Sequence, residues 1–134
     1  MKKIIFIIAL ICFQLSMNSQ HLVNEIRCLH EIIKKNDFVI KRTENIGTIY
    51  TIDELEKTII IKTIQRGNST QDDFIIENSI SSFYAKVYTC SRLNDNDNSK
   101  YFITVMKDKV TLLLDKQGIL IESPIISSDS HVID

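Results

Sequence analysis

The sequence contains no tryptophan, only one proline, three glycines and three cysteines among 134 residues. So few glycines exclude collagen-like repeats and glycine-rich phosphate loops, and so few cysteines exclude a scaffold held by many disulfides. The formal net charge is −1 and no block of basic residues is present. This balance argues against nucleic acid as a partner, because such binding requires several phosphates to be neutralised at once. The length suits one domain, and 44% of the residues are hydrophobic.

The first 19 residues have the layout of a secretory signal peptide. Lys2 and Lys3 precede an apolar run over residues 4–13, and small and polar residues follow up to Ser19. The run is too short for a transmembrane helix, which needs about 20 apolar residues. We therefore predict cleavage near Ser19, no membrane span afterwards, and a periplasmic or secreted protein. A lipid anchor at Cys12 and an uncleaved membrane anchor remain as alternatives.

Residues 21–36 predict an amphipathic helix. Leu22, Ile26, Leu29 and Ile32 recur at helical spacing, and Asn36-Asp37 would end the helix. The later chain is rich in short β-branched runs separated by turn signals. The expected strands are 38–42, 46–52, 58–65, 74–77, 82–92, 100–107, 110–114 and 119–122.

The predicted fold class is α+β, with one N-terminal helix packed on a curled antiparallel β-meander of about five to seven strands. The expected domain covers residues 20–123, and residues 124–134 are expected to form a partly flexible tail. The segment 51–65 is ambiguous between strand and helix. We favour a short helical turn at 53–57 followed by a strand, because a β-branched run resists helix formation. Residues 115–118 predict a tight turn with glycine at positive φ.

Both faces of the expected sheet carry large apolar groups, and one helix would cover only part of one face. The remaining surface would be closed by curling of the sheet, by the tail, by self-association or by a partner. Aromatic side chains dominate interface energetics. The candidate binding residues are therefore Tyr84, Tyr88, Tyr101 and Phe102, with core packing as their alternative role.

Two cysteines follow the predicted leader, Cys28 and Cys90. In an exported protein such a pair is a candidate disulfide, which here would require the helix to pack against the strand that carries Cys90. Two unrelated buried thiols are the alternative, since free cysteine behaves as a small core residue.

No catalytic or metal-binding motif is present. His30-Glu31 begins like a zinc-protease motif, but Lys34 stands where the second histidine is required. The Asp- and Asn-rich loop before Lys100 resembles a calcium loop, yet Lys100 and Met106 occupy the positions that require Gly and Glu. We therefore predict no metal, no cofactor and no enzymatic activity.

These observations predict a small exported binding or interaction protein of the bacterial envelope. Its partner would be another protein, as for an immunity or inhibitor protein that blocks a toxin or hydrolase, or a second copy of the chain. The alternative is a carrier of a small apolar ligand held between helix and sheet. A single stoichiometric protein partner would favour the first hypothesis, and a closed apolar cavity the second.

Overall fold

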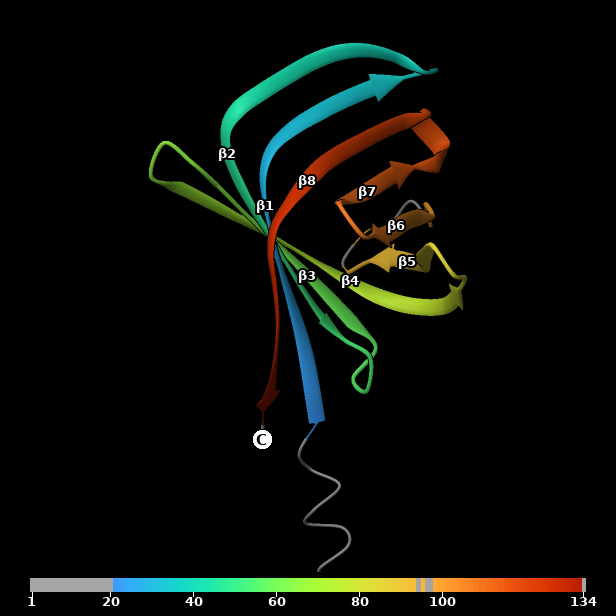
Figure 1. Cartoon of the computed structure of the whole chain (residues 1–134). Coiled ribbons are helices and arrows are strands. Elements are labelled where there is room, and N and C mark those ends of the chain that lie inside the picture. Colours follow the sequence, from blue (N-terminus) through green and yellow to red (C-terminus); the bar gives the residue numbers. More distant parts are fainter. Residues whose placement is uncertain (1–20, 94, 96–97, 134) are drawn as a thin grey trace, which may run out of the picture.

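The computed structural model describes residues 21–93, 95 and 98–133, and in it eight antiparallel strands form a closed barrel (Figure 1). The predicted signal peptide, residues 1–19, lies outside the described residues. Each strand pairs with the next along the chain, and β8 pairs with β1 to close the ring. The strands are β1 (His21–Lys35), β2 (Phe38–Asp53), β3 (Thr58–Gln65), β4 (Asn68–Ser81), β5 (Ala85–Arg92), β6 (Tyr101–Met106), β7 (Lys109–Leu114) and β8 (Ile119–Ile133).

The predicted α+β fold with an N-terminal helix is wrong, because residues 21–35 form strand β1, paired with β2 on one side and β8 on the other. The spacing of these apolar residues does not mark one buried face. Ile26 and Cys28 belong to the barrel core, whereas Leu22 and Leu29 of the same predicted stripe are 64% and 38% exposed. Apolar residues on both faces of β1 therefore imitate a helical stripe.

The segment expected to end the helix is a hairpin turn between β1 and β2. Asn36 and Asp37 have φ values of 51° and 68°, the signs that a two-residue type I′ turn requires. The turn predicted at residues 115–118 is present, and Gly118 (φ 65°) follows the short 3₁₀ helix η1 (Asp115–Gln117). Arg66 and Gly67 join β3 to β4, both with positive φ.

The ambiguous segment 51–65 consists of the end of β2, a turn and the whole of β3. The Glu56 N–H donates a 3.0 Å hydrogen bond to Asp53 Oδ1 within the turn, and β3 begins at Thr58. The predicted strand begins at Thr58 as expected, whereas Asp53 ends β2 and residues 54–57 form a turn in place of the predicted helical turn at 53–57. Residues 124–133, expected to belong to a flexible tail, are the second part of β8 and pair with β1.

Closure of the sheet buries its inner face. Ile59, Cys90, Ile103 and Val110 are fully buried and come from β3, β5, β6 and β7. Burying an aliphatic side chain of this size stabilises a fold by about 1.5–3 kcal/mol. The sheet therefore covers its own apolar face by curling, so the core needs no helix. The remaining members of the core are Ile26, Cys28, Tyr50, Ile52, Ile61, Phe74, Ile76, Tyr88 and Tyr101.

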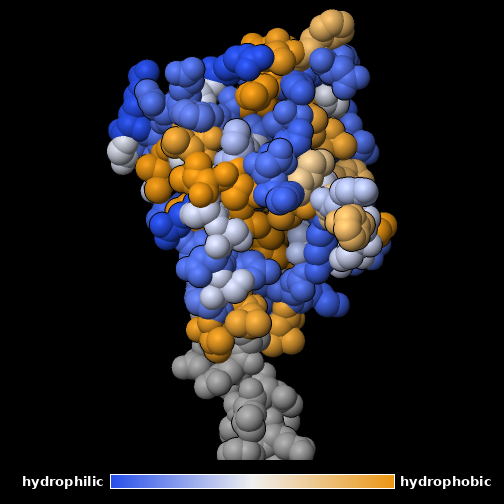
Figure 2. All heavy atoms as spheres, viewed as in Figure 1, coloured by the Kyte–Doolittle hydropathy of each residue, from blue (hydrophilic) through white to orange (hydrophobic). Residues whose placement is uncertain are grey.

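Apolar and charged side chains alternate on the outer surface. Figure 2 shows apolar residues gathered in the middle of one face and again at its lower end, with polar residues between them. Leu22 and Val132, cross-strand partners where β1 begins and β8 ends, are 64% and 58% exposed. No helix in the described part of the chain is long and apolar enough to cross a membrane.

Candidate functional site

A pocket of about 250 Å³ opens inside the barrel at the end that carries the β3–β4 and β7–β8 turns. We call it the lumen pocket. Six of the eight strands contribute to its wall: β1, β2, β3, β4, β7 and β8. Its aliphatic lining residues are Ile46, Ile61, Leu112 and Ile121, and its polar lining residues are Glu31, Thr48, Tyr50, Thr63 and Asp72. Apolar surface for a ligand's chain combined with polar groups that can orient it is typical of a small-molecule site.

Strand alternation places most of these side chains in the lumen. Ile46, Thr48 and Tyr50 are separated by two residues on β2 and are all buried, so they share the inner face. The register with β3 pairs Thr48 with Thr63 and Tyr50 with Ile61. Neighbouring inward positions of β2 and β3 therefore form one continuous patch of wall.

Glu31 reaches the same pocket because of the bulge in β1. Between the pairs Cys28–Ile125 and Ile32–Glu122, β1 has three residues and β8 has two, so β1 carries one extra residue there. Between them His30 adopts a φ of 71°, and its Nδ1 donates a hydrogen bond to the carbonyl oxygen of Glu44. This local distortion sets the face to which Glu31 points, since a one-residue shift reverses the direction of every following side chain.

Burial changes the acidity of the pocket's polar groups. It raises the pKa of the Glu31 carboxyl, against the opposing influence of the Lys41 cation. It also raises the pKa of the Tyr50 hydroxyl; the Cys28 and Glu31 side chains raise it further, and an interaction with the Ser123 hydroxyl opposes them. Tyr50 therefore keeps its proton at neutral pH.

One hydroxyl in the pocket is unpaired. Thr48 is 3% exposed, and its Oγ1 has no hydrogen-bond partner within the described part of the chain. Buried polar atoms are nearly always hydrogen-bonded in folded proteins. An unpaired hydroxyl on a residue that lines a pocket marks a place where a bound ligand would supply the missing partner.

Asp72 is already paired. Its carboxylate accepts a hydrogen bond from Arg92 and forms an ion pair with it, which raises the pKa of the guanidinium. Both side chains are about half exposed, so this pair lies near solvent. Of the two carboxyls that line the lumen pocket, Glu31 is thus the one that forms no direct ion pair with another described residue.

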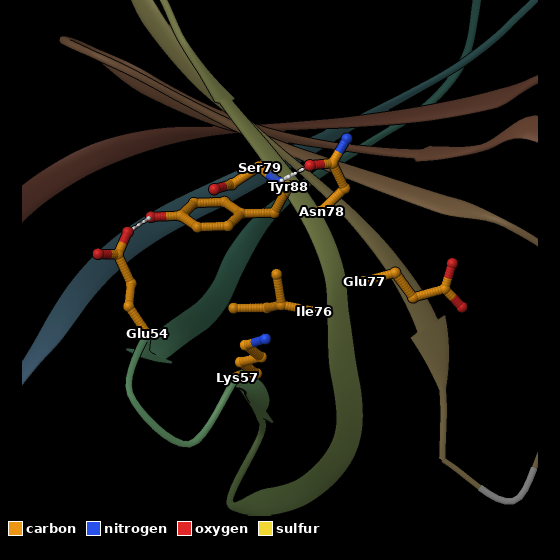
Figure 3. Close-up of a pocket in the computed structure, with 7 residues that line it drawn as sticks. All are labelled: Glu54, Lys57, Ile76, Glu77, Asn78, Ser79 and Tyr88. Carbon is orange, nitrogen blue, oxygen red and sulfur yellow. Dashed lines mark hydrogen bonds between the residues drawn. The ribbon is translucent and has the colours of Figure 1, made fainter.

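A second pocket, of about 350 Å³, lies by the β2–β3 turn (Figure 3). We call it the rim pocket. Ile76 and Tyr88, both buried, lie beneath it, and the Tyr88 hydroxyl donates a 2.7 Å hydrogen bond to Glu54 Oε1. The Asn78 side chain accepts a 2.9 Å hydrogen bond from the Ser79 N–H.

The two carboxylates of the rim pocket are paired with lysines that do not line it. Glu54 also pairs with Lys86, and Glu77, whose carboxylate points away from the other labelled side chains in Figure 3, pairs with Lys100. Hydrogen-bonded and paired in this way, these groups hold the turn and β4 in place. The lumen pocket, which contains an unpaired buried hydroxyl, is the better candidate for a ligand site.

The four aromatic residues predicted as binding residues are not brought together. Tyr84 is 81% exposed in the β4–β5 turn, where its ring meets Phe83 edge-on at 5.1 Å. Tyr88 and Tyr101 belong to the core, whereas Phe102 alternates with Tyr101 on β6 and is half-buried. The four residues are therefore divided between the core, a turn and the sheet, and do not form one surface.

The two cysteines are free thiols, both buried in the core. Burial raises the pKa of Cys28 to about 11 and that of Cys90 to about 12. The predicted disulfide therefore finds no support, and the helix on which that pairing depended is absent from the described residues.

Residues 21–93, 95 and 98–133 contain no group of three or more His, Cys, Asp or Glu side chains arranged to hold a metal ion. Comparisons with protein-family models, with curated proteins and with solved structures find no match to this chain. The protein class is therefore defined by its architecture alone, an antiparallel eight-stranded barrel of nearest-neighbour connections. Fold alone does not give function, so the function must be argued from the lumen pocket.

Proposed function

We propose that this chain is an exported, non-enzymatic binding protein that carries a small, largely apolar ligand in the lumen pocket. The observation that carries the proposal is the pocket itself, about 250 Å³ between aliphatic side chains of β2, β3, β7 and β8, with a buried unpaired hydroxyl in its wall. An eight-stranded barrel is wide enough inside to hold one small ligand. The ligand would lie within the barrel, and not between a helix and a sheet.

The size of the pocket limits the ligand. Water occupies about 30 Å³ per molecule in the liquid, so the lumen pocket has room for about eight to ten non-hydrogen atoms. This range suits an eight-carbon chain with one head group.

Blocking the pocket tests the proposal. Thr63 lines the pocket and is half-buried, so Thr63→Phe would fill it, whereas its neighbour Ile64 is 40% exposed and Ile64→Phe would not. The probes are 1-octanol, octylamine and octanoate, which share a chain length and differ in head group. We expect calorimetry to detect binding of at least one probe to the wild type and to Ile64→Phe, and not to Thr63→Phe. Binding that survives Thr63→Phe, or no binding of any probe at millimolar concentration, would contradict the proposal.

A protein partner is the second candidate, favoured by an exposed apolar run at the start of β2. Phe38, Val39 and Ile40 are 76%, 43% and 58% exposed beside the β1–β2 turn. Consecutive exposed apolar residues of this kind mark contact surfaces. Self-association through this run predicts a dimer in sedimentation velocity that is lost in a Phe38→Ser, Ile40→Ser double variant. A monomer at all concentrations would exclude the homodimer.

A further inference from the structure

The chemistry of the lumen pocket also limits the head group of its ligand, an inference that rests on the proposed function. Glu31 and Asp72 line the pocket, and no lysine, arginine or histidine is among its described lining residues. Ionised carboxylates only accept hydrogen bonds. A ligand carboxylate or phosphate would meet like charges there, and burying such a contact is costly.

Glu31 is the carboxylate that remains for a ligand. Asp72 is engaged by Arg92, whereas the cation that acts on Glu31, Lys41, is exposed and does not line the pocket. Glu31 on β1 and Tyr50 on the neighbouring strand β2 both line the pocket.

Thr48 supplies the independent observation. Thr48 lines the pocket, and its hydroxyl is buried and has no partner among the described residues. A hydroxyl can accept as well as donate, and so can that of Tyr50. Together with Glu31, the pocket lining therefore includes three side chains that can accept hydrogen bonds, as many as the N–H donors of an ammonium ion.

We propose that the lumen pocket binds a small aliphatic amine. Its ammonium group would donate hydrogen bonds to Glu31, Thr48 and Tyr50, and its chain would lie against Ile46, Ile61, Leu112 and Ile121. Pairing with a carboxylate compensates the cation for the water that it loses on entering the pocket. The Thr48 hydroxyl gains in the complex the partner that it lacks in the empty protein.

The three eight-carbon probes separate the head-group inference from the proposed function. At neutral pH, calorimetry is expected to show octylamine binding at least about tenfold tighter than 1-octanol or octanoate. Glu31→Gln, which keeps the shape and removes the charge, should abolish this preference, and Thr48→Val should weaken octylamine binding several-fold. Glu56→Gln is the matched control, because Glu56 is an exposed carboxylate of the β2–β3 turn that does not line the lumen pocket. Circular dichroism of each variant verifies that it is folded.

The outcomes are distinct. If 1-octanol or octanoate binds as tightly as octylamine, or if Glu31→Gln keeps the preference for the amine, the head-group inference is overturned. In that case the proposed function still stands, provided that Thr63→Phe abolishes the binding. If none of the three probes binds, both are overturned. An equal loss of octylamine binding in Glu56→Gln would show unspecific attraction to an acidic surface and would also overturn the inference.

Discussion

Tyr88 donates its hydroxyl hydrogen to Glu54 Oε1 at 2.7 Å, and so connects a buried ring of β5 with the turn between β2 and β3. The same carboxylate pairs with Lys86, whose ammonium lies 5.4 Å from the centre of the Tyr88 ring. The Ile76 N–H donates to the Lys57 carbonyl oxygen at 2.8 Å. These contacts connect the β2–β3 turn to β4 and β5. They add to the connections that the pairing of neighbouring strands supplies.

Removing the hydroxyl of Tyr88 should destabilise the barrel. Tyr88→Phe keeps the buried ring and loses the hydrogen bond to a carboxylate that is itself about half exposed. We expect the free energy of unfolding to fall by about 1 kcal/mol, measured by urea denaturation. Tyr84→Phe is the control, because Tyr84 lies exposed in a turn. Equal stabilities of Tyr88→Phe and the wild type would show that the bond contributes nothing.

The same network predicts a pH dependence of stability. The hydrogen bond from Lys86, and after it that from Tyr88, holds the pKa of Glu54 below its usual value of 4.5. A carboxyl with a lowered pKa in the folded state contributes stability above its unfolded pKa and loses it as the pH falls through the folded one. As the pH falls from about 5 to about 3, the free energy of unfolding of Glu54→Gln should therefore decrease less than that of the wild type.

The comparison is made by urea denaturation at several pH values, with Glu56→Gln as the control. Glu56 is an exposed carboxyl of the same turn, so its replacement should leave the acid limb unchanged. Parallel acid limbs of the wild type and Glu54→Gln would contradict a lowered pKa.

Local patterns were enough to predict most strands and turns. The β-branched run of β3 and the glycine of the β7–β8 turn specify their conformation through their own side chains, and both lie where the sequence places them. The pairing of β1 with β8 is different, because it joins segments from opposite ends of the described chain. No local sequence pattern in residues 21–35 indicates that this segment pairs with a strand on each side. The bulge at His30 also breaks the alternation by which a strand would be predicted.

The lumen pocket could be predicted only in part. The alternation of Ile46, Thr48, Tyr50 and Ile52 is visible in the sequence and marks one buried face of β2. The inward position of Glu31 depends on the bulge, and the juxtaposition of β2 with β7 and β8 across the lumen depends on closure. Neither relation is encoded in a short stretch of sequence. The binding residues were therefore predicted from residue type alone, as aromatic residues, and two of them, Tyr88 and Tyr101, belong to the core.

Gly118 and Asn36 make a close contact between two turns. Gly118 has a φ of 65°, and a Cβ at this position would lie 3.3 Å from Asn36 Oδ1. The Asn36 N–H also donates to the Gly118 carbonyl oxygen at 3.5 Å. Gly118→Ala should therefore lower the free energy of unfolding by about 1–2 kcal/mol, measured by thermal denaturation.

Gly67→Ala separates the two causes. Gly67 also has a positive φ, of 80°, but no atom lies within 4 Å of the position that an alanine methyl group would occupy there. This variant should show the conformational penalty of about 1 kcal/mol without the contact. An effect of Gly67→Ala as large as that of Gly118→Ala would mean that the Asn36 contact carries no strain.

The thiols of Cys28 and Cys90 should resist modification in the folded protein. Both are buried, and pKa values of about 11 and about 12 leave almost no thiolate at neutral pH. In protein that begins at residue 20, an aromatic disulfide reagent should label neither thiol before denaturation and both after it. Asn68→Cys, at the exposed first residue of β4, supplies a reactive control. An intact mass lower by two hydrogens under non-reducing conditions would contradict free thiols and restore the disulfide.

Thr48→Val should make the empty protein more stable. The variant keeps the shape of a 3% exposed side chain and removes a hydroxyl that has no partner among the described residues. Relief of that desolvation penalty is worth about 1 kcal/mol, which urea denaturation can resolve. Thr51→Val is the control, because Thr51 is half-buried and its side chain alternates with the inward-facing residues of β2. It should change the free energy of unfolding by less than about 0.5 kcal/mol.

This gain should reverse when ligand is present. A compound that binds only the folded state stabilises it according to its affinity, so the wild type, with its Thr48 hydroxyl satisfied, should gain more from octylamine than Thr48→Val does. An unpaired hydroxyl that costs stability in the empty barrel and contributes affinity in the filled one is the signature of a site shaped for function. If Thr48→Val were less stable than the wild type without ligand, the hydroxyl would have a structural partner, and its role in the lumen pocket would have to be abandoned.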